Sequence, residues 1–147
     1  MVKILFICHG NICRSPMAEY ILKDMVHRAG RDAAFEIDSA AVSREEIGNG
    51  VYPPARRELA RHGVSCGDHR ARQVTMEDYR HFDRIYYMDA SNGRYLARML
   101  PRDDEKIRPM LDREVADPWY TGDFRKTYED VVKGCEALLR SIEGKTL

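Results

Sequence analysis

The chain has 147 residues with 24 basic and 24 acidic side chains, and hydrophobic residues make up 44% of it. This charge balance gives no support for bulk binding of nucleic acid or of a membrane surface. The first residues, MVKILFIC, hold an apolar run too short for a signal peptide or a membrane span. We therefore expect one cytoplasmic domain, residues 1–147, with a sizeable core.

Short apolar runs alternate with helical patterns along the chain. In order, we expect a strand at 2–7, a helix at 15–30, a strand at 34–40, a helix at 53–64, a strand at 83–89, a helix at 91–100, an edge strand at 106–111 and a helix at 123–144. Ser15 as N-cap, Pro16 in the first turn and Gly30 past the end would delimit the first helix. The alternation predicts an α/β fold, a single-domain three-layer α/β/α sandwich with a central, mainly four-stranded parallel twisted sheet.

The segment CHGNICRSP, residues 8–16, joins the first strand to the first helix. A tight turn containing Gly10 before a helix N-terminus lets backbone N–H groups converge on one point, as in phosphate sites. Arg14 adds a two-pronged donor for phosphate oxygens. The same positive surroundings favour the thiolate of Cys8, to which Ser15 can donate a hydrogen bond. A thiolate at the base of a phosphate site is a nucleophile directed at phosphorus.

Nucleotide-binding and redox loops fit this spacing less well. A nucleotide-binding P-loop needs a second glycine and a lysine, and a redox pair needs C-x-x-C, whereas four residues separate Cys8 from Cys13. The cysteines lack zinc-ligand spacing, so we expect no metal and no cofactor. Cys66 and Cys135 are interpreted as small buried hydrophobic residues.

Phosphoryl transfer to a thiolate also needs a proton for the departing oxygen. The best candidate donor lies in VADPWYTGD, where Asp117 precedes a proline that keeps the aspartate backbone extended. Trp119 and Tyr120 follow it and offer aromatic walls for a flat substrate group. Asp-Pro is also common at ordinary turns and helix starts, and the aromatic pair is what favours a catalytic interpretation here.

With these segments in view, the sequence resembles the low-molecular-weight protein tyrosine phosphatases, in particular the bacterial type. The resemblance runs from CHGNICRSPMAE through IDSA, VYPPARRELARHG, HRARQVT and FDRIYYMDASN to DPWY and the last helix. It implies a phosphatase that hydrolyses phosphotyrosine monoesters through a phosphocysteine. Cys8 would be the nucleophile, Arg14 the phosphate clamp and Asp117 the general acid and then base.

The resemblance also implies a phosphate-binding loop and a network that holds it open. The loop comprises His9, Gly10, Asn11, Ile12, Cys13 and Ser15. The supporting network would comprise Asn11, Ser39 and His69, and Asn11 tolerates the left-handed backbone that such a loop needs. Without the resemblance, Ser39 and His69 would be interpreted as ordinary structural polar side chains.

The substrate slot is expected to be formed by Ile12, Trp119 and Tyr120, with Glu45 and Tyr52 as further candidates. Animal members of the family carry an aromatic rim residue near Glu45, so an acid there would change which phosphopeptides are accepted. Two interpretations of His9 stay open: its ring either tunes the pH dependence or points outward. We also expect Cys8 and Cys13 to approach each other, so that oxidation would join them in a protective disulfide.

Three alternative functions share this fold or loop. Arsenate reductases relay a disulfide through extra cysteines, but residues 67–134 contain none. Arginine phosphatases of the family carry Thr where this loop has Ile12, and a non-catalytic phosphate-binding module would not need both nucleophile and acid. The expected partner is a tyrosine-phosphorylated protein, with a bacterial tyrosine kinase as one candidate. Inorganic phosphate or vanadate would inhibit, and neither nucleic acid nor membrane is expected to bind.

Overall fold

A computed structural model describes residues 1–146, with side chains described up to residue 143. The strands are β1 (Val2–Cys8), β2 (Phe35–Ala41), β3 (Arg84–Tyr87) and β4 (Ile107–Pro109). The helices are α1 (Arg14–Arg28), the 3₁₀ turn η1 (Asp32–Ala34), α2 (Pro53–Arg61), α3 (Met76–His81), α4 (Ala90–Met99), α5 (Pro118–Thr121) and α6 (Phe124–Thr146). Among residues 1–146, no helix combines the length and apolarity needed to cross a membrane.

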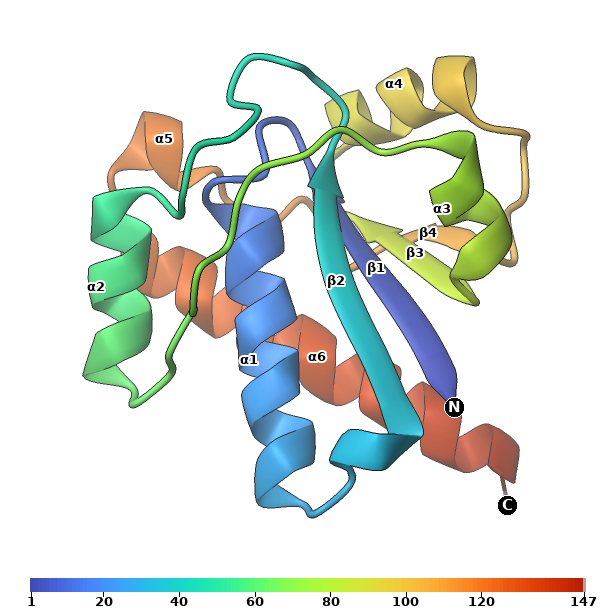
Figure 1. Ribbon diagram of the computed structural model, residues 1–147, viewed down its shortest axis with the longest axis horizontal. Coiled ribbons are helices and arrows are strands. Elements are labelled where there is room, and N and C mark those ends of the chain that lie inside the picture. The colour runs from blue at the N-terminus through green and yellow to red at the C-terminus, as the bar shows by residue number, and fades with distance from the viewer. Residues whose placement is uncertain (147) are drawn as a thin grey trace.

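The four strands form one parallel sheet in the order β2-β1-β3-β4 (Figure 1). Strand β1 lies inside it, paired with β2 over its whole length. Its side chains alternate between the two faces, as strand geometry requires, and every residue from Ile4 to Ile7 is fully buried. The predicted α/β sandwich is confirmed, including the short β4 at the edge of the sheet.

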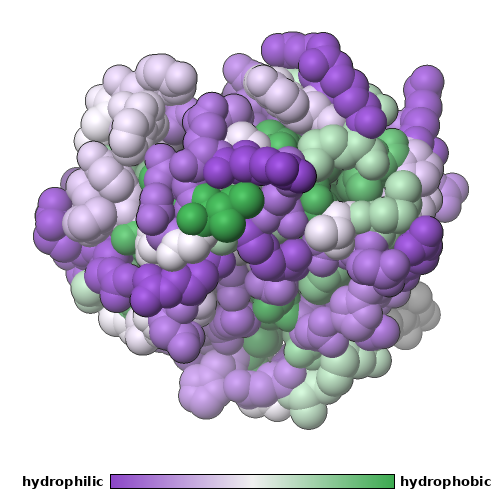
Figure 2. Space-filling model, turned by 45° about the horizontal axis from the view of Figure 1, so that its top comes forward, coloured by the Kyte–Doolittle hydropathy of each residue, from purple (hydrophilic) through white to green (hydrophobic). Residues whose placement is uncertain are grey.

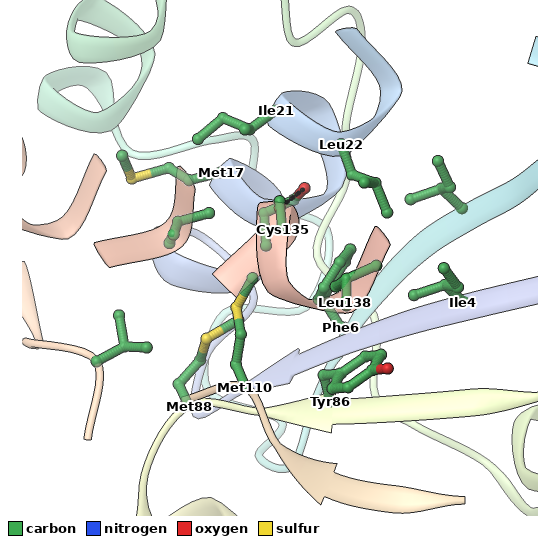
Figure 3. Packing of buried hydrophobic residues seen from close by; sticks show 14 of the residues in the cluster. Ile4, Phe6, Met17, Ile21, Leu22, Tyr86, Met88, Met110, Cys135 and Leu138 are labelled. Carbon is green, nitrogen blue, oxygen red and sulfur yellow. Dashed lines mark hydrogen bonds between the residues drawn. The ribbon is translucent and has the colours of Figure 1, made fainter. Parts of the chain in front are cut away.

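Each face of the sheet is covered by its own helices. Ile4 and Phe6 point into the larger core, where α1 and α6 pack against the sheet and α2 packs on their outer side (Figures 1 and 3). Leu5 and Ile7 point into a smaller core closed by α3 and α4. Cys135 lies fully buried in the larger core, as the sequence predicted. The sheet is thereby held rigidly beneath the loops at its carboxyl edge.

The start of α1 differs from the sequence prediction. The helix begins at Arg14 after Cys13, and no side chain caps it, so the prediction of Ser15 as N-cap is wrong. The hydroxyl of Ser15 lies inside the first turn and contacts the sulfur of Cys8 instead. Gly30 does follow the end of the helix in a left-handed conformation, with φ of 69°.

Two short helices were not predicted. Helix α3 has a capping box in which Thr75 and Asp78 satisfy each other's backbone N–H groups, a signal that was present in the sequence. Helix α5 has only four residues and begins after Asp117, whose carboxylate caps it. Short helices of this kind have too few residues to show a hydrophobic period.

Candidate active site

A pocket of about 460 Å³ opens at the carboxyl edge of the sheet, above the β1–α1 loop. Ligands of parallel α/β folds bind at this edge, because loops from several strands meet there. Figure 1 shows α4 and α5 on opposite sides of the β1–α1 loop. The lining residues come from the loop, the β2–α2 segment, α4 and α5: Cys8, His9, Gly10, Ile12, Cys13, Arg14, Glu45, Glu46, Asp89, Ser91, Asn92, Tyr95, Asp117, Trp119 and Tyr120.

Asn11 holds the loop in shape from below. Its backbone is left-handed, with φ of 61°, the only such non-glycine residue among those described. Its amide nitrogen donates to Ser15 Oγ at 2.8 Å and to Ser39 Oγ at 2.9 Å, and its amide oxygen accepts from the backbone N–H of Arg72 at 3.2 Å. The buried side chain therefore ties the loop to α1, β2 and the segment before α3.

A second layer of contacts supports that arrangement. The hydroxyl of Ser39 donates to Glu19 Oε1 at 2.6 Å, and His69 Nε2 lies 2.8 Å from the carbonyl oxygen of Asn11. Glu19 is almost fully buried, and Lys23 pairs with it at 2.6 Å. The structure thus brings Asn11, Ser39 and His69 together, and adds Glu19 to the group.

The Cys8 sulfur lies at the end of β1, within the concave side of the loop. Ser15 Oγ is 3.0 Å from it, and the Ser15 backbone N–H donates to it at 3.4 Å. The N-terminus of α1 begins beside this sulfur, and its partial positive charge favours an anion there. The surroundings suit a thiolate and a bound phosphate in turn.

Gly10 leaves room for the neighbouring segment. A Cβ at this position would lie 3.3 Å from Glu46 Cγ. A side chain at this position would thus crowd Glu46, which would have to shift by a few tenths of an ångström. The left-handed backbone of the loop is supplied by Asn11 and not by Gly10.

The guanidinium of Arg14 is buried at the floor of the pocket and meets two carboxylates. Its Nη1 donates to the carbonyl oxygen of Val115 at 3.0 Å and pairs with Asp89 Oδ2 at 2.9 Å, while Nη2 donates to Asp117 Oδ2 at 3.3 Å. Burial alone would lower the pKa of Arg14, but the neighbouring Cys8, Asp117 and Asp89 raise it above its ordinary value. Nε makes no hydrogen bond to residues 1–146, so the Nε–Nη2 edge is the one available for a ligand.

The carboxylate of Asp117 is held at both oxygens. Oδ1 accepts from the Trp119 backbone N–H at 3.0 Å, as the N-cap of α5, and Oδ2 accepts from Arg14. About a quarter of its side chain is exposed, and it lines the pocket. The capping contact fixes one oxygen, so the other is directed at the floor of the pocket.

The aromatic residues form one wall. Trp119 and Tyr120 line the pocket and are well exposed, at 56% and 85%. Tyr52 packs against Trp119, with ring centroids 5.1 Å apart, and its ring also contacts that of Phe124. Tyr52 therefore supports the wall rather than lining it.

Ile12 lies at the base of this wall. It lines the pocket but is only 9% exposed, because it also packs against Cys13 and Ala71. Its side chain thus gives the pocket an apolar surface near the loop.

The opposite wall contains three side chains in contact. His9 Nε2 lies 3.2 Å from Glu45 Oε2, and the His9 ring meets the edge of Tyr95 at 5.9 Å. Glu45 is thus brought to the rim, as the sequence suggested, while Tyr95 on α4 was not predicted.

The four cysteines all carry free thiols. Cys13 is buried under the loop, and burial, with Cys8 and Asp117 adding to it, raises the pKa of its thiol. Burial likewise raises the pKa of Cys135. Cys66 is buried beside a second, shallower hollow at the end of α2. Within residues 1–146, no three His, Cys, Asp or Glu side chains are placed to hold a metal ion.

Sequence reasoning missed Glu19, Glu46, Asp89 and Tyr95, and also the lining residues Ser91 and Asn92. Glu19 lies four residues after Ser15, hence on the same face of α1, and this spacing could have indicated it. Asp89 follows β3, the neighbour of β1, at the edge where ligands bind. Tyr95 had no sequence signal, since a tyrosine on an amphipathic helix is ordinary.

Comparison with known proteins gives a consistent result. A family model described as low molecular weight phosphotyrosine protein phosphatase matches residues 3–146. The low molecular weight protein-tyrosine-phosphatase YfkJ of Bacillus subtilis is 38% identical in sequence over 97% of both chains. The crystal structure of YfkJ superposes on all of this chain and on 98% of its own with a TM-score of 0.95. The human low molecular weight phosphotyrosine protein phosphatase is 39% identical over 92% of each chain. The crystal structure of a Drosophila arginine phosphatase, 30% identical, covers 96% of this chain and 98% of its own with a TM-score of 0.84.

Proposed function

This chain belongs to the low molecular weight phosphotyrosine protein phosphatase family, and we propose how its own residues hydrolyse a phosphotyrosine monoester. The enzyme is a protein tyrosine phosphatase with a phosphocysteine intermediate. We assign the nucleophile to Cys8, the phosphate clamp to Arg14 and the proton transfers to Asp117. The observation that supports this assignment is that Cys8, Arg14 and Asp117 line the same pocket. The Cys8 sulfur lies 3.0 Å from Ser15 Oγ, and Arg14 is hydrogen-bonded to Asp117.

In the first step, the Cys8 thiolate attacks phosphorus and the bond from phosphorus to the tyrosyl oxygen breaks. Asp117 gives its proton to the departing phenolate, which leaves as tyrosine. The hydroxyl of Ser15 stabilises the thiolate before attack and again when it leaves. Asn11 supports this role because its amide nitrogen donates to the same hydroxyl, orienting the Ser15 proton toward sulfur.

Arg14 stabilises the transferring phosphoryl group. Val115 and Asp89 anchor its Nη1, so the Nε–Nη2 edge can donate two parallel hydrogen bonds to two phosphate oxygens. The incoming dianion competes with Asp117 for Nη2, whose present bond of 3.3 Å is long. Substrate binding thereby releases the carboxyl oxygen that has to reach the leaving group.

In the second step, Asp117 accepts a proton from a water molecule as that water attacks phosphorus. The bond from sulfur to phosphorus breaks, the Cys8 thiolate returns and inorganic phosphate is released. Inorganic phosphate and vanadate should inhibit, because they occupy the same loop with the same oxygen contacts.

The substrate is a phosphorylated protein, and we propose a tyrosine-phosphorylated one, such as a bacterial tyrosine kinase carrying phosphotyrosines. A phenyl ring suits a slot bounded by Trp119, Tyr120 and the apolar surface of Ile12. We also propose that residues 1–147 are a single catalytic domain that works in the cytoplasm. The four free thiols support a reducing compartment.

The test is turnover of p-nitrophenyl phosphate by the purified protein and by Cys8→Ser. The variant should fold and bind vanadate but lose nearly all turnover, since a serine hydroxyl is scarcely ionised at neutral pH. Cys66→Ala, which changes a buried cysteine outside the pocket, is the control and should keep activity. Trapping of a phosphoryl group on Cys8 in rapidly quenched wild type would add direct support. Retained turnover in Cys8→Ser would overturn the assignment.

A further inference from the structure

The pocket is chemically different on its two sides. The α5 side is aromatic, with Trp119 and Tyr120. The opposite side, which we call the acidic wall, consists of His9, Glu45, Glu46 and Tyr95. Helices α4 and α5 lie on opposite sides of the β1–α1 loop (Figure 1), and Tyr95 of the acidic wall belongs to α4.

The Glu45 carboxylate is positioned rather than freely mobile. Its Oε2 contacts His9 Nε2 at 3.2 Å, and the His9 ring is in turn packed on the edge of Tyr95. The Glu45 side chain nevertheless remains 68% exposed, so it can meet another molecule.

Among the described residues, no arginine or lysine forms an ion pair with Glu45 or Glu46, which contact His9 and Asn49 instead. Arg44, the neighbour of Glu45, directs its guanidinium to Gln73 at 3.0 Å. Arg14 lies at the floor and is already bound to two carboxylates. Arg98 lies over the Tyr95 ring, 5.9 Å from its centroid, on the side of α4.

Glu46 adds a second carboxylate to the wall, half-buried and accepting from Asn49 at 2.6 Å. The pocket therefore has the Arg14 guanidinium and the N-terminus of α1 at its floor and the Glu45 and Glu46 carboxylates at its rim. Figure 2, in which the top of Figure 1 comes forward, shows a mainly hydrophilic surface with separate apolar patches. Glu45 and Glu46 therefore place two carboxylates where the residues that flank the phosphotyrosine would lie.

Resting on the phosphatase function above, we propose that the acidic wall selects phosphotyrosine substrates with a lysine or arginine next to the phosphotyrosine. The phosphate binds the floor, and the flanking cation pairs with Glu45. The partly exposed Tyr95 ring offers apolar surface for the methylene stem of that side chain. An acidic flanking residue is repelled by the same carboxylates.

The test uses three phosphotyrosine peptides, identical except for Lys, Gln or Glu on both sides of the phosphotyrosine. For the wild type, kcat/KM should fall in the order Lys, Gln, Glu, with a Lys-to-Glu ratio of about two- to tenfold at low salt, as expected for solvent-exposed ion pairs. Raising the salt to about 0.5 M should shrink the ratio, because screening then acts within a few ångströms.

Two variants locate the effect. Glu45→Gln should lower the Lys-to-Glu ratio, with Glu46 keeping part of the preference, and this ratio, taken within one protein, is insensitive to any change in overall rate. Glu36→Gln is the matched control, a half-buried glutamate near the start of β2 that pairs with His81, and it should leave the ratio at its wild-type value.

Equal kcat/KM for the Lys and Glu peptides in the wild type would overturn the proposal, as would an unchanged ratio in Glu45→Gln. Failure of the phosphatase assignment looks different, because then none of the three peptides would be hydrolysed.

Discussion

Arg14 and Asp117 are hydrogen-bonded to each other at 3.3 Å, so the proposed clamp and the proposed acid are partners before a substrate arrives. The pair joins residues at opposite ends of the chain and closes the floor of the pocket. Substitution of either residue must therefore be interpreted with the other in view, since each loses a partner when its neighbour changes.

Asp117→Asn should slow hydrolysis in a way that depends on the leaving group. The amide keeps the shape and can still cap α5, but it cannot give up a proton. For phenyl phosphate, a poor leaving group, kcat should fall by about 10²–10⁴-fold, the usual size of general acid catalysis. For p-nitrophenyl phosphate the loss should be smaller. Asp112→Asn, an exposed control, should leave both rates unchanged, and an equal loss for both substrates would count against Asp117 as the acid.

Oxidation of the loop should be reversible through Cys13. Peroxide converts the Cys8 thiolate to a sulfenic acid, and attack by the Cys13 thiol forms a disulfide with release of water. Because burial raises the pKa of Cys13, we expect this capture to be slow at neutral pH and faster as pH rises.

Activity lost to peroxide should therefore return with dithiothreitol in the wild type, and Cys13→Ser should lose that recovery. Peptide mapping by mass spectrometry gives the direct readout. A bridge from Cys8 to Cys66, or no bridge at all, would refute the pairing.

Ile12→Thr should shift substrate preference toward phosphoarginine. In the wild type, the guanidinium N–H groups of phosphoarginine would face the apolar Ile12 without a partner. Leaving such groups unpaired costs about 1–3 kcal/mol, equivalent to about a ten- to hundredfold preference for phosphotyrosine. A threonine hydroxyl can accept one of those N–H groups.

The measurement for Ile12 is kcat/KM for phosphotyrosine, phosphoserine and phosphoarginine substrates. Ile12→Val keeps an apolar branched side chain and should keep the preference for phosphotyrosine, which makes it the matched control. Phosphoserine should be poor throughout, because its stem is too short to contact the aromatic wall. If the wild type handles phosphoarginine as well as phosphotyrosine, the argument from Ile12 fails.

Gly134→Ala should destabilise the protein although alanine favours a helix. A Cβ at this position in α6 would lie 2.6 Å from Met110 Cγ, in the core that Figure 3 shows. The helix gains about 0.5–1 kcal/mol, but overpacking a core costs about 1–3 kcal/mol. We expect Tm to fall by about 2–4 °C per kcal/mol of net loss.

The control for Gly134 is the same substitution in a Met110→Ala background, where space has been made. There Gly134→Ala should be neutral or stabilising, and thermal unfolding of the four proteins of this cycle measures the coupling. A loss of the same size in both backgrounds would mean that Met110 is not the obstacle.

The sequence was sufficient for the fold because the buried strands and long helices each carry their own local signal. The apolar run before Cys8 indicates a buried strand, and the Pro and Gly residues near the helix ends indicate where helices begin and end. Each of these signals spans only a few residues. The predicted start of α1 was wrong because a serine at a helix start is usually an N-cap, whereas the hydroxyl of Ser15 contacts the sulfur of Cys8. That role depends on how the loop curls, which no local rule describes.

The site was predictable where one contiguous segment builds it. Cys8 and Arg14 belong to a single loop, so their proximity follows from spacing. Asp89 and Tyr95 belong to the site because β3 lies beside β1, which places α4 next to the loop. A single sequence does not reveal the order of the strands in the sheet. Asp117 was predicted from its aromatic neighbours, and it lies in the pocket beside Arg14.

The bond from Arg14 to the carbonyl of Val115 spans 101 positions of the chain. During synthesis, the ribosome releases the thiol and the guanidinium early, whereas the carbonyl that anchors the guanidinium and the carboxyl at Asp117 follow about a hundred residues later. A growing chain thus carries a cysteine loop long before it has the partners that make the loop a catalyst. Nascent chains would remain inactive toward phosphoproteins near the ribosome until Val115 and Asp117 have emerged and packed against Arg14.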